Sequence, residues 1–225
     1  MPARGQSPRK GTLMAKLLTS RDMAKISCRS CSGCGACCRD MGDSIHLDPY
    51  DLYLLTKNLG RSFSDLLDTS IALHTEEGLV LPHLLMKEDG KGLPCCAFLD
   101  REGRCSVHSF RPGLCRLFPL GRDYDGTSFS YFIVEGGCVM PGKSKVRISS
   151  WLGYEDLASY ETFTARWHYF VKDMQKILGE SQDPEGSRQL ALYILQKFYV
   201  QPWDPSGDFF GEFEERLSLI RRAFS

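Results

Sequence analysis

Five cysteines lie within eleven residues of the chain, in the run CRSCSGCGACCRD from residue 28 to residue 40. Five more follow at Cys95, Cys96, Cys105, Cys115 and Cys138. An even number of cysteines suits a disulfide framework, but such frameworks belong to small secreted domains. This chain has 225 residues, enough for an ordinary core, and its N-terminus lacks the apolar stretch of a secretory signal. Because clustered cysteines in a reducing compartment more often bind metal or do redox chemistry, we expect a cytoplasmic metal-binding protein.

The spacing of the first run is typical of a metal-binding loop. Residues 31–37 hold three cysteines, each separated from the next by two residues. In such loops two thiolates converge on one ion while backbone N–H groups point at the sulfurs. Gly33 and Gly35 suit them, because a backbone that turns around a metal often needs a positive φ. The side chains of the adjacent pair Cys37 and Cys38 tend to diverge, so two metal centres or one polynuclear cluster accommodate them better than a single ion.

The same run also allows an iron-sulfur interpretation. Four of its cysteines, from Cys28 to Cys38, match the spacing of bacterial ferredoxins, in which three cysteines bind one cubane cluster and the fourth ligates another. Arg39 replaces the proline that usually follows, and the chain holds no second copy of the run. A ferredoxin proper is therefore not expected, while zinc and an iron-sulfur cluster both stay open.

The second group of cysteines lies in residues 94–121. The segments CAFLD (96–100) and RCSVH (104–108) predict two short strands around a turn. Pro112 predicts the first turn of a short helix, which places Cys115 near a helix N-terminus, where the helix dipole lowers the pKa of a thiol. Cys138 follows the apolar alternation of residues 128–137 and ends a further predicted strand.

Together these segments resemble a known family. CSGCGACCR (31–39), CAFLDREGRCSVHSFRPGLCRLFP (96–119) and Cys138 are similar to the YkgJ-type CxxCxxCC cysteine-cluster family, described as zinc- or iron-chelating. The resemblance covers roughly residues 28–142. It implies a set of thiolate metal ligands consisting of Cys31, Cys34, Cys37, Cys38, Cys96, Cys105, Cys115 and Cys138. Cys28 and Cys95 fall outside the family's pattern, and each is interpreted as a spare thiol.

The resemblance leaves two functional hypotheses. The first is a metal-stabilised binding module that chelates zinc or iron, and closed all-thiolate sites favour it. The second is an iron-sulfur-dependent enzyme with a [4Fe-4S] cluster, acting on a protein or peptide. It follows from the similarity of the cysteine cluster to that of flagellin lysine N-methylase, a protein methyltransferase, and fold alone does not fix that activity. No GxSxG, HExxH or phosphate-binding glycine motif supports a conventional hydrolase or nucleotide-binding protein.

A thiolate cage concentrates negative charge and needs hydrogen-bond donors around its sulfurs. Arg39, Arg111 and Arg116 are adjacent to predicted ligands and are candidates for that role. Arg111 has an equally good alternative, in which it caps or packs the predicted hairpin. His108 lies three residues after Cys105, but we interpret it as structural because the thiol set is complete without it.

Composition limits the partners. The chain has 28 basic and 28 acidic side chains, so no global field favours nucleic acid or an anionic membrane. No apolar stretch approaches the roughly 18 to 20 residues that span a bilayer. We expect a basic, disordered lead over residues 1–27, a cysteine-cluster metal-binding domain over 28–142 and a helical extension over 143–225 that packs on it.

The predicted fold class is α+β, with a small cysteine-rich core of short strands and loops, flanking helices and a C-terminal helical layer. Asp48 and Pro49 predict the start of a helix that a shorter one follows within residues 47–67. A long amphipathic helix is predicted from an N-cap at Ser150 to a stop at Gly179. Two further helices are predicted over residues 187–200 and 211–224.

Overall fold

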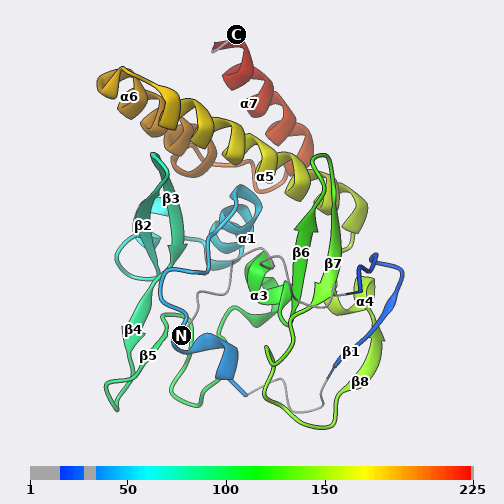
Figure 1. The fold of residues 1–225 in the computed structure, drawn as a ribbon. Helices are drawn as coiled ribbons and strands as arrows, with labels where there is room; N and C mark the ends of the chain where they lie inside the picture. Colours follow the sequence, from blue (N-terminus) through cyan, green and yellow to red (C-terminus); the bar gives the residue numbers. More distant parts are fainter. Residues whose placement is uncertain (1–15, 28–33, 224–225) are drawn as a thin grey trace.

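The computed structural model describes residues 16–27 and 34–223, and it combines helices with small antiparallel sheets (Figure 1). Each strand of the described residues pairs with a single neighbour. The pairs are β1 (Met23–Ser27) with β8 (Ser144–Arg147), β2 (Ile71–Glu76) with β3 (Leu79–Leu84), β4 (Met86–Glu88) with β5 (Pro94–Cys96), and β6 (Leu120–Tyr124) with β7 (Phe129–Ile133). The predicted α+β class is confirmed.

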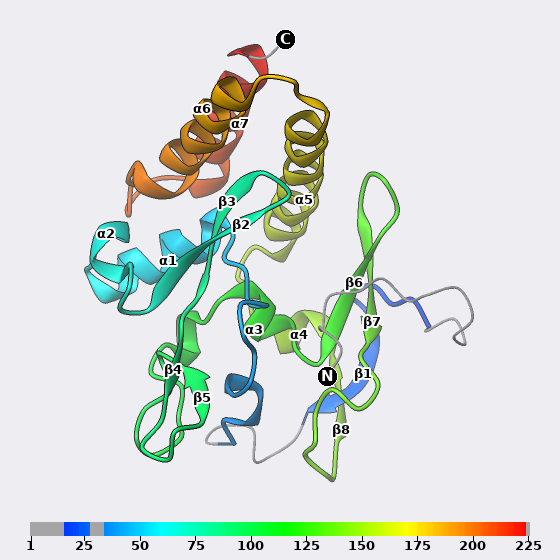
Figure 2. The same ribbon diagram turned by 60° about the vertical axis from the view of Figure 1, so that its left-hand side comes forward.

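The C-terminal helices form a layer at one end of the molecule. They are α5 (Leu157–Glu180), α6 (Pro184–Leu195), which continues into the π-helical turn η3 (Gln196–Val200), and α7 (Phe209–Ala223). Figures 1 and 2 show this layer above β2, β3 and the helix α1, on the side away from β4, β5 and β8. The predicted C-terminal helical layer is therefore confirmed.

The predicted ends of the long helix are wrong. Ser150 lies inside a separate short helix, α4 (Ile148–Leu152), which ends at Gly153 in the left-handed conformation with φ 66°. The N-cap of α5 is Asp156, whose carboxylate accepts a hydrogen bond from the Ser159 N–H at 3.1 Å. Gly179 lies within α5, which continues to Glu180. Apolar periodicity continues across the break at Gly153, so the pattern alone does not reveal the second start.

The start of α1 (Pro49–Leu59) follows directly from its sequence. The Asp48 carboxylate accepts a hydrogen bond from the Asp51 N–H at 2.8 Å, and the Asp51 carboxylate accepts one from the Asp48 N–H at 3.1 Å. This reciprocal capping box satisfies two backbone donors that a helix start leaves open. A second capping box of the same kind, Ser62 with Asp65, starts the short helix α2 (Phe63–Leu66). Both predicted helices are confirmed.

One hydrophobic core joins the C-terminal helices to the cysteine-containing loops. It includes fully buried side chains of α1, β2, α5 and α7 together with Val107, which lies between two of the predicted ligands. A smaller core lies under β1, β6, β7 and α4, around Ile26, Tyr131 and Ile148. Burying apolar side chains is worth about 1.5 to 3 kcal/mol each. The packing of the cysteine loops is therefore tied to that of the helical layer.

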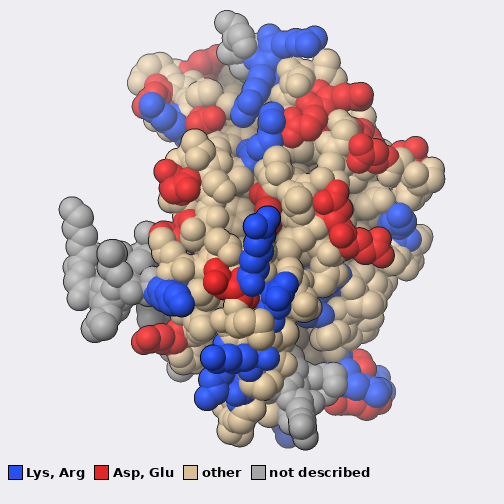
Figure 3. All heavy atoms as spheres, turned by 90° about the vertical axis from the view of Figure 1, so that its right-hand side faces the viewer, with Lys and Arg blue, Asp and Glu red and all other residues tan. Residues whose placement is uncertain are grey.

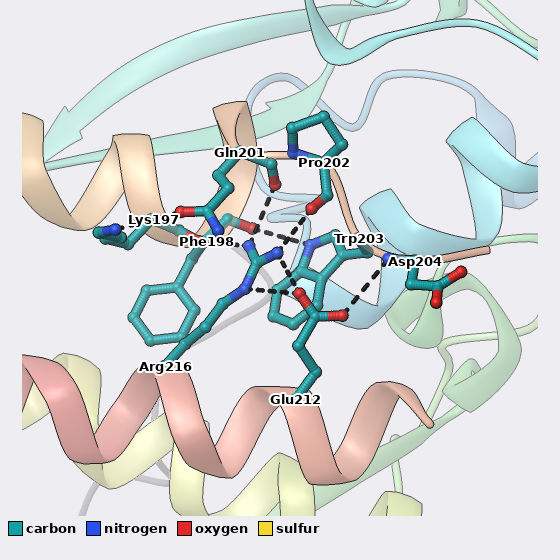
Figure 4. A network of polar contacts seen from close by, with 8 residues as sticks. All are labelled: Lys197, Phe198, Gln201, Pro202, Trp203, Asp204, Glu212 and Arg216. Carbon is teal, nitrogen blue, oxygen red and sulfur yellow. Dashed lines mark hydrogen bonds and ion pairs between the residues drawn. The ribbon is translucent and has the colours of Figure 1, made fainter. Parts of the chain in front are cut away.

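A buried arginine attaches α7 to the segment after η3 (Figure 4). The Arg216 side chain is only 5% exposed and its guanidinium lies 3.7 Å from the centre of the Trp203 ring. Its N–H groups donate to the backbone carbonyls of Lys197, Gln201 and Pro202 at 2.6, 3.0 and 2.6 Å. Glu212, one turn earlier on α7, pairs with the same guanidinium. The arginine thus satisfies carbonyls that the end of a helix leaves without partners.

The surface carries both signs of charge. On the face shown in Figure 3, acidic and basic side chains are interspersed, with a small group of Lys and Arg near its lower end. Over the described part of the chain, no helix combines the length and the apolar character that a bilayer span requires.

Candidate metal centre

A glycine contact brings the first cysteine run against the second. Gly35 has φ 59° and precedes the short 3₁₀-helix η1 (Ala36–Cys38). A Cβ atom on Gly35 would lie 2.8 Å from the carbonyl oxygen of Gly103, in the turn between Cys96 and Cys105. Only a residue without a side chain fits this approach. The positive φ expected for Gly35 is confirmed, while Gly33, Cys28 and Cys31 lie outside the described residues.

The segment 96–108 forms a closed loop, and the two predicted strands are wrong. Cys96 ends β5, which pairs with β4 instead. The two arms are joined by the isolated bridge between Leu99 and Cys105, with backbone hydrogen bonds from Asp100 to Arg104 and from Ser106 to Phe98, but they form no regular strands. The Asp100 carboxylate accepts the Arg104 N–H at 2.7 Å. Two other backbone N–H groups, those of Phe98 and Val107, donate to the thiols of Cys96 and Cys105. Donors that a hairpin ladder would use are directed at sulfur, as in metal-binding loops.

Cys115 lies on the predicted short helix, α3 (Gly113–Leu117), which follows Pro112. The expected lowering of its pKa is wrong, because burial raises the pKa of this thiol well above its ordinary value, and Cys96 and Asp51 raise it further. The helix has only five residues. None of the groups that act most strongly on the pKa of Cys115 is a cation that would lower it. Desolvation of the thiolate therefore outweighs the dipole of so short a helix.

Five thiols, those of Cys37, Cys38, Cys96, Cys105 and Cys115, act on one another electrostatically, and we call them the five-thiol cluster. A hydrogen bond with Cys37 raises the pKa of Cys38, with contributions from burial and from the nearby thiols of the cluster. Burial and the neighbouring thiols Cys105, Cys95 and Cys37 raise the pKa of Cys96 to about 11. Three separate segments of the chain thus contribute thiols that disfavour one another's negative charge.

Two further predicted ligands share a cavity with Cys37. Cys34 and Cys138 line a small cavity of about 80 Å³ together with Cys37. The remaining walls of this cavity are mainly apolar and include Ile26, Phe118, Met140 and Trp151. The prediction that Cys138 ends a strand is wrong, because β7 ends at Ile133 and Cys138 lies in the loop that follows. Its carbonyl accepts a hydrogen bond from Lys143 Nζ at 2.8 Å. Cys37 is thus common to the five-thiol cluster and to this cavity.

Cys95 differs from its neighbour Cys96 although both are buried. The alternation of side chains along β5 points the two thiols to opposite faces. Cys95 pairs with Lys87 in β4 and forms an isolated bridge with Arg39. Its surroundings are therefore those of a structural thiol.

The arginines next to the predicted ligands have different roles. Arg39 forms an ion pair with Asp89 at 2.7 Å. Arg116 donates to the backbone carbonyls of Ser109, Arg111 and Leu152, and so holds α3 against α4. Arg111 donates to the His108 carbonyl at 2.8 Å, and its positive charge lowers the pKa of Cys105, against the larger effect of burial. Arg111 therefore both packs the loop and acts electrostatically on a predicted ligand.

The donor set suits a soft metal in its chemistry. Buried thiols that raise one another's pKa become stable thiolates when a cation lies among them. As placed, however, no group of three or more His, Cys, Asp or Glu side chains within the described residues is close enough to hold one ion. Binding an ion in the five-thiol cluster therefore requires its sulfur atoms to approach one another.

Comparison with known families agrees with this chemistry. Residues 30–133 match the model of the CxxCxxCC family, whose description is "Putative zinc- or iron-chelating domain". Residues 30–133 are thus similar to the CxxCxxCC family over a little less than half of the chain. The matched range contains every predicted ligand except Cys138, which lies just beyond it. Comparison with curated proteins and with solved structures found no significant match.

The sequence analysis missed a second concentration of polar groups. A cavity of about 590 Å³ lies between α5, β6 and the segment before α1, and Leu114 of α3 forms part of its wall. Two sequence signals point to it. Arg122 and Tyr124 alternate along β6 and so share a face, while Thr164, Trp167 and His168 recur at helical spacing on α5.

Proposed function

We propose that the CxxCxxCC domain of this chain binds zinc or iron through eight cysteine thiolates. The ligands are Cys31, Cys34, Cys37, Cys38, Cys96, Cys105, Cys115 and Cys138. The five-thiol cluster carries the proposal, because thiols from three segments share a partly buried site whose mutual electrostatics oppose ionisation. A bound cation removes that opposition, and the free energy of metal binding then becomes folding free energy.

The arrangement favours more than one ion, or one polynuclear cluster such as [4Fe-4S]. Cys37 and Cys38 are adjacent, and Cys37 belongs both to the five-thiol cluster and to the lining of the small cavity with Cys34 and Cys138. A set composed only of thiolates leaves no exchangeable position, which is typical of structural zinc. The proposed role is therefore to hold the cysteine run against the loop 94–119 and against the core that both share with the helical layer.

Substitution of single cysteines tests the ligand assignment. Cys37→Ser and Cys115→Ser should each lower the zinc or iron content of the full-length protein by about half or more, because removing one thiolate opens a closed site. Cys95→Ser is the matched control, since Cys95 is as buried as Cys96 but belongs to no proposed site. Metal is measured by elemental analysis after purification without oxygen. Unchanged metal content in both ligand variants would refute the assignment.

A second candidate function is an iron-sulfur-dependent enzyme, such as a protein lysine N-methylase-like methyltransferase. It is favoured by the cavity of about 590 Å³, whose wall includes the residue before Cys115. The test supplies iron-loaded protein with S-adenosylmethionine and a lysine-containing peptide and measures methylated peptide by mass spectrometry. Product that depends on Cys115 would support this candidate, and a protein that binds only zinc and forms no product would count against it.

A further inference from the structure

The larger cavity has the dimensions and the walls of a ligand site. Its volume of about 590 Å³ lies in the range of small-molecule sites. One face of α5 forms a wall, through Thr164, Trp167, His168, Val171, Lys172 and Gln175. Other walls come from β6 and from residues 43–51, with further contributions from β2 and β3. Segments far apart in the sequence therefore line a space that the hydrophobic core does not fill.

An arginine in this cavity has a donor without an acceptor, and the carboxyl groups of Asp48 and Asp51 act on it only from beyond ion-pair distance. Arg122 Nη2 donates to the Tyr160 hydroxyl at 3.0 Å, and the guanidinium lies over the rings of Phe129 and Tyr160. Its Nε is buried and has no hydrogen-bond partner, and within the described residues Arg122 forms no ion pair. A buried donor without an acceptor is costly, and a guanidinium is well suited to bind a carboxylate. Arg122 therefore marks the place of an anionic group.

Two other polar atoms in the cavity wall lack partners. Thr164 is 5% exposed, yet its Oγ1 has no hydrogen bond, although a threonine within a helix can bond to the carbonyl four residues earlier. His46 Nδ1 is also buried without a hydrogen bond, 3.7 Å from Glu76 Oε2. These atoms come from two different segments that line the cavity. A ligand with both donors and acceptors would satisfy them together.

The same cavity contains an excess of carboxyl groups. Asp43, Asp48, Asp51 and Glu76 line it, against the positive groups Arg122 and Lys172. Burial raises the pKa of Asp48 to about 6 and also raises that of Asp51, although Arg122 acts in the opposite direction on both. Lys172 does not neutralise them, because it lies 3.8 Å from Glu77 and bonds to Gln175. A positively charged ligand group would therefore be favoured beside Asp48 and Asp51.

Aromatic and aliphatic side chains complete the walls. The rings of Tyr124 and His168 stack at 3.5 Å with an angle of 8° between their planes, and Trp167 and Val171 lie on the same face of α5 as His168. Leu81 and Leu114 also line the cavity. Apolar side chains thus lie beside charged groups of both signs, an arrangement that can orient a small dipolar molecule.

We propose that this cavity binds a zwitterionic ligand of the amino acid class, with its carboxylate on Arg122 and its ammonium group facing Asp48 and Asp51. The ligand is either a free α-amino acid or a short peptide, because both carry the two charged groups. The apolar wall of Trp167 and Val171 accommodates its side chain. This proposal does not depend on the metal site, so either can fail without the other.

Calorimetric titration of the full-length protein, as purified with its metal, tests the proposal. The probes are L-phenylalanine and the dipeptide Ala-Phe, each compared with its N-acetyl and C-amide derivatives. At least one free zwitterion should bind, and blocking either of its charged ends should weaken binding about tenfold or more. Stronger binding of the dipeptide identifies a peptide as the ligand, and the reverse order identifies a free amino acid. Absence of binding by both zwitterions, or equal binding of the blocked forms, would overturn the proposal.

Variants assign the binding to this cavity. Arg122→Gln should weaken the zwitterion about tenfold or more, whereas Arg166→Gln on an exposed part of α5 should leave affinity unchanged. Because Arg122 supports neighbouring rings, Thr164→Val and Glu76→Gln serve as milder variants that retain the fold, which circular dichroism checks. Each should weaken binding at least threefold. Unaltered affinity in both milder variants would place the ligand elsewhere and overturn the proposal.

Discussion

The carboxylate of Asp51 accepts a hydrogen bond from the backbone N–H of Gly113 at 2.7 Å. This contact joins the first turn of α1 to the first turn of α3, two residues before Cys115. The same carboxyl lines the large cavity and raises the pKa of Cys115. One buried side chain thus contacts the helix that carries a proposed metal ligand and also contributes to the proposed zwitterion site.

Replacing this carboxyl should destabilise the protein more than an ordinary helix cap does. Asp51→Ala should lower the free energy of unfolding by about 2 to 4 kcal/mol, because it removes the capping box and leaves the buried Gly113 N–H without an acceptor. Asp65→Ala is the matched control, since Asp65 has the same position in the exposed capping box of α2. Asp65→Ala should lower the free energy of unfolding clearly less than Asp51→Ala does. Urea unfolding measures both, and equal losses would show that the contact with Gly113 is unimportant.

The approach of Gly35 to Gly103 should be intolerant of any side chain. Gly35→Ala should lower both the metal content and the free energy of unfolding, because the new Cβ would lie 2.8 Å from a backbone oxygen. Gly42→Ala is the control, since Gly42 also has a positive φ, 54°, but a Cβ added there would meet no other atom within 4 Å. Gly42→Ala should lower the free energy of unfolding by only about 1 to 2 kcal/mol, which is the strain of a left-handed backbone at alanine. Equal metal content in the two variants would contradict the docking described for Gly35.

The geometry of Arg216 should make even a lysine a poor replacement. Arg216→Lys should lower the free energy of unfolding by about 2 to 4 kcal/mol, because an ammonium group cannot bond to three carbonyls and stack on Trp203 at once. Arg166→Lys, in an exposed ion pair with Glu214 at 2.8 Å, should change it by about 0 to 1 kcal/mol. Chemical denaturation of both variants gives the comparison. A loss below that of Arg166→Lys would show that the network in Figure 4 contributes little.

His168 should make part of the stability depend on pH. Burial lowers the pKa of this imidazole to about 4, with smaller contributions from Lys172 and Arg122. In the unfolded chain this imidazole has an ordinary pKa near 6.5, so between pH 6.5 and pH 4 the unfolded chain binds more protons than the folded protein. The contribution of His168 to the free energy of unfolding is therefore complete above pH 6.5 and declines as the pH falls towards 4. Between pH 7 and 4.5, wild type should lose about 1 to 2 kcal/mol more than His168→Gln, after allowance for partial exposure. Denaturant unfolding at both pH values measures this, with His74→Gln as an exposed control. Parallel pH profiles of wild type and His168→Gln would contradict the assignment.

Local signals predicted local structure well. Asp48 followed by Pro49 starts α1 as expected, because a capping box depends only on residues within one turn. The positive φ of Gly35 was also predictable, since only glycine adopts it without strain. The partner of Gly35 was not, because Gly103 lies far along the chain and no spacing rule connects the two.

The sequence-based predictions that were wrong or missing concern contacts that form only when distant segments pack together. Residues 96–108 have the composition of two strands, but the N–H groups of Phe98, Arg104 and Val107 bond to thiols or to the Asp100 carboxylate, so no regular ladder forms between the two arms. The pKa of Cys115 depends on burial by the core, which the position of a residue in a short helix does not reveal. Arg122 and Thr164 appeared unremarkable in sequence because their significance lies in the partners they lack after folding.

Elemental analysis, combined with assay of acid-labile sulfide and a visible spectrum, on full-length protein purified without oxygen tests the central claim most directly. The account predicts either about two zinc ions per chain in a colourless solution or iron with sulfide and an absorption band near about 400 nm. Protein that folds cooperatively with neither zinc nor iron in stoichiometric amount would contradict it.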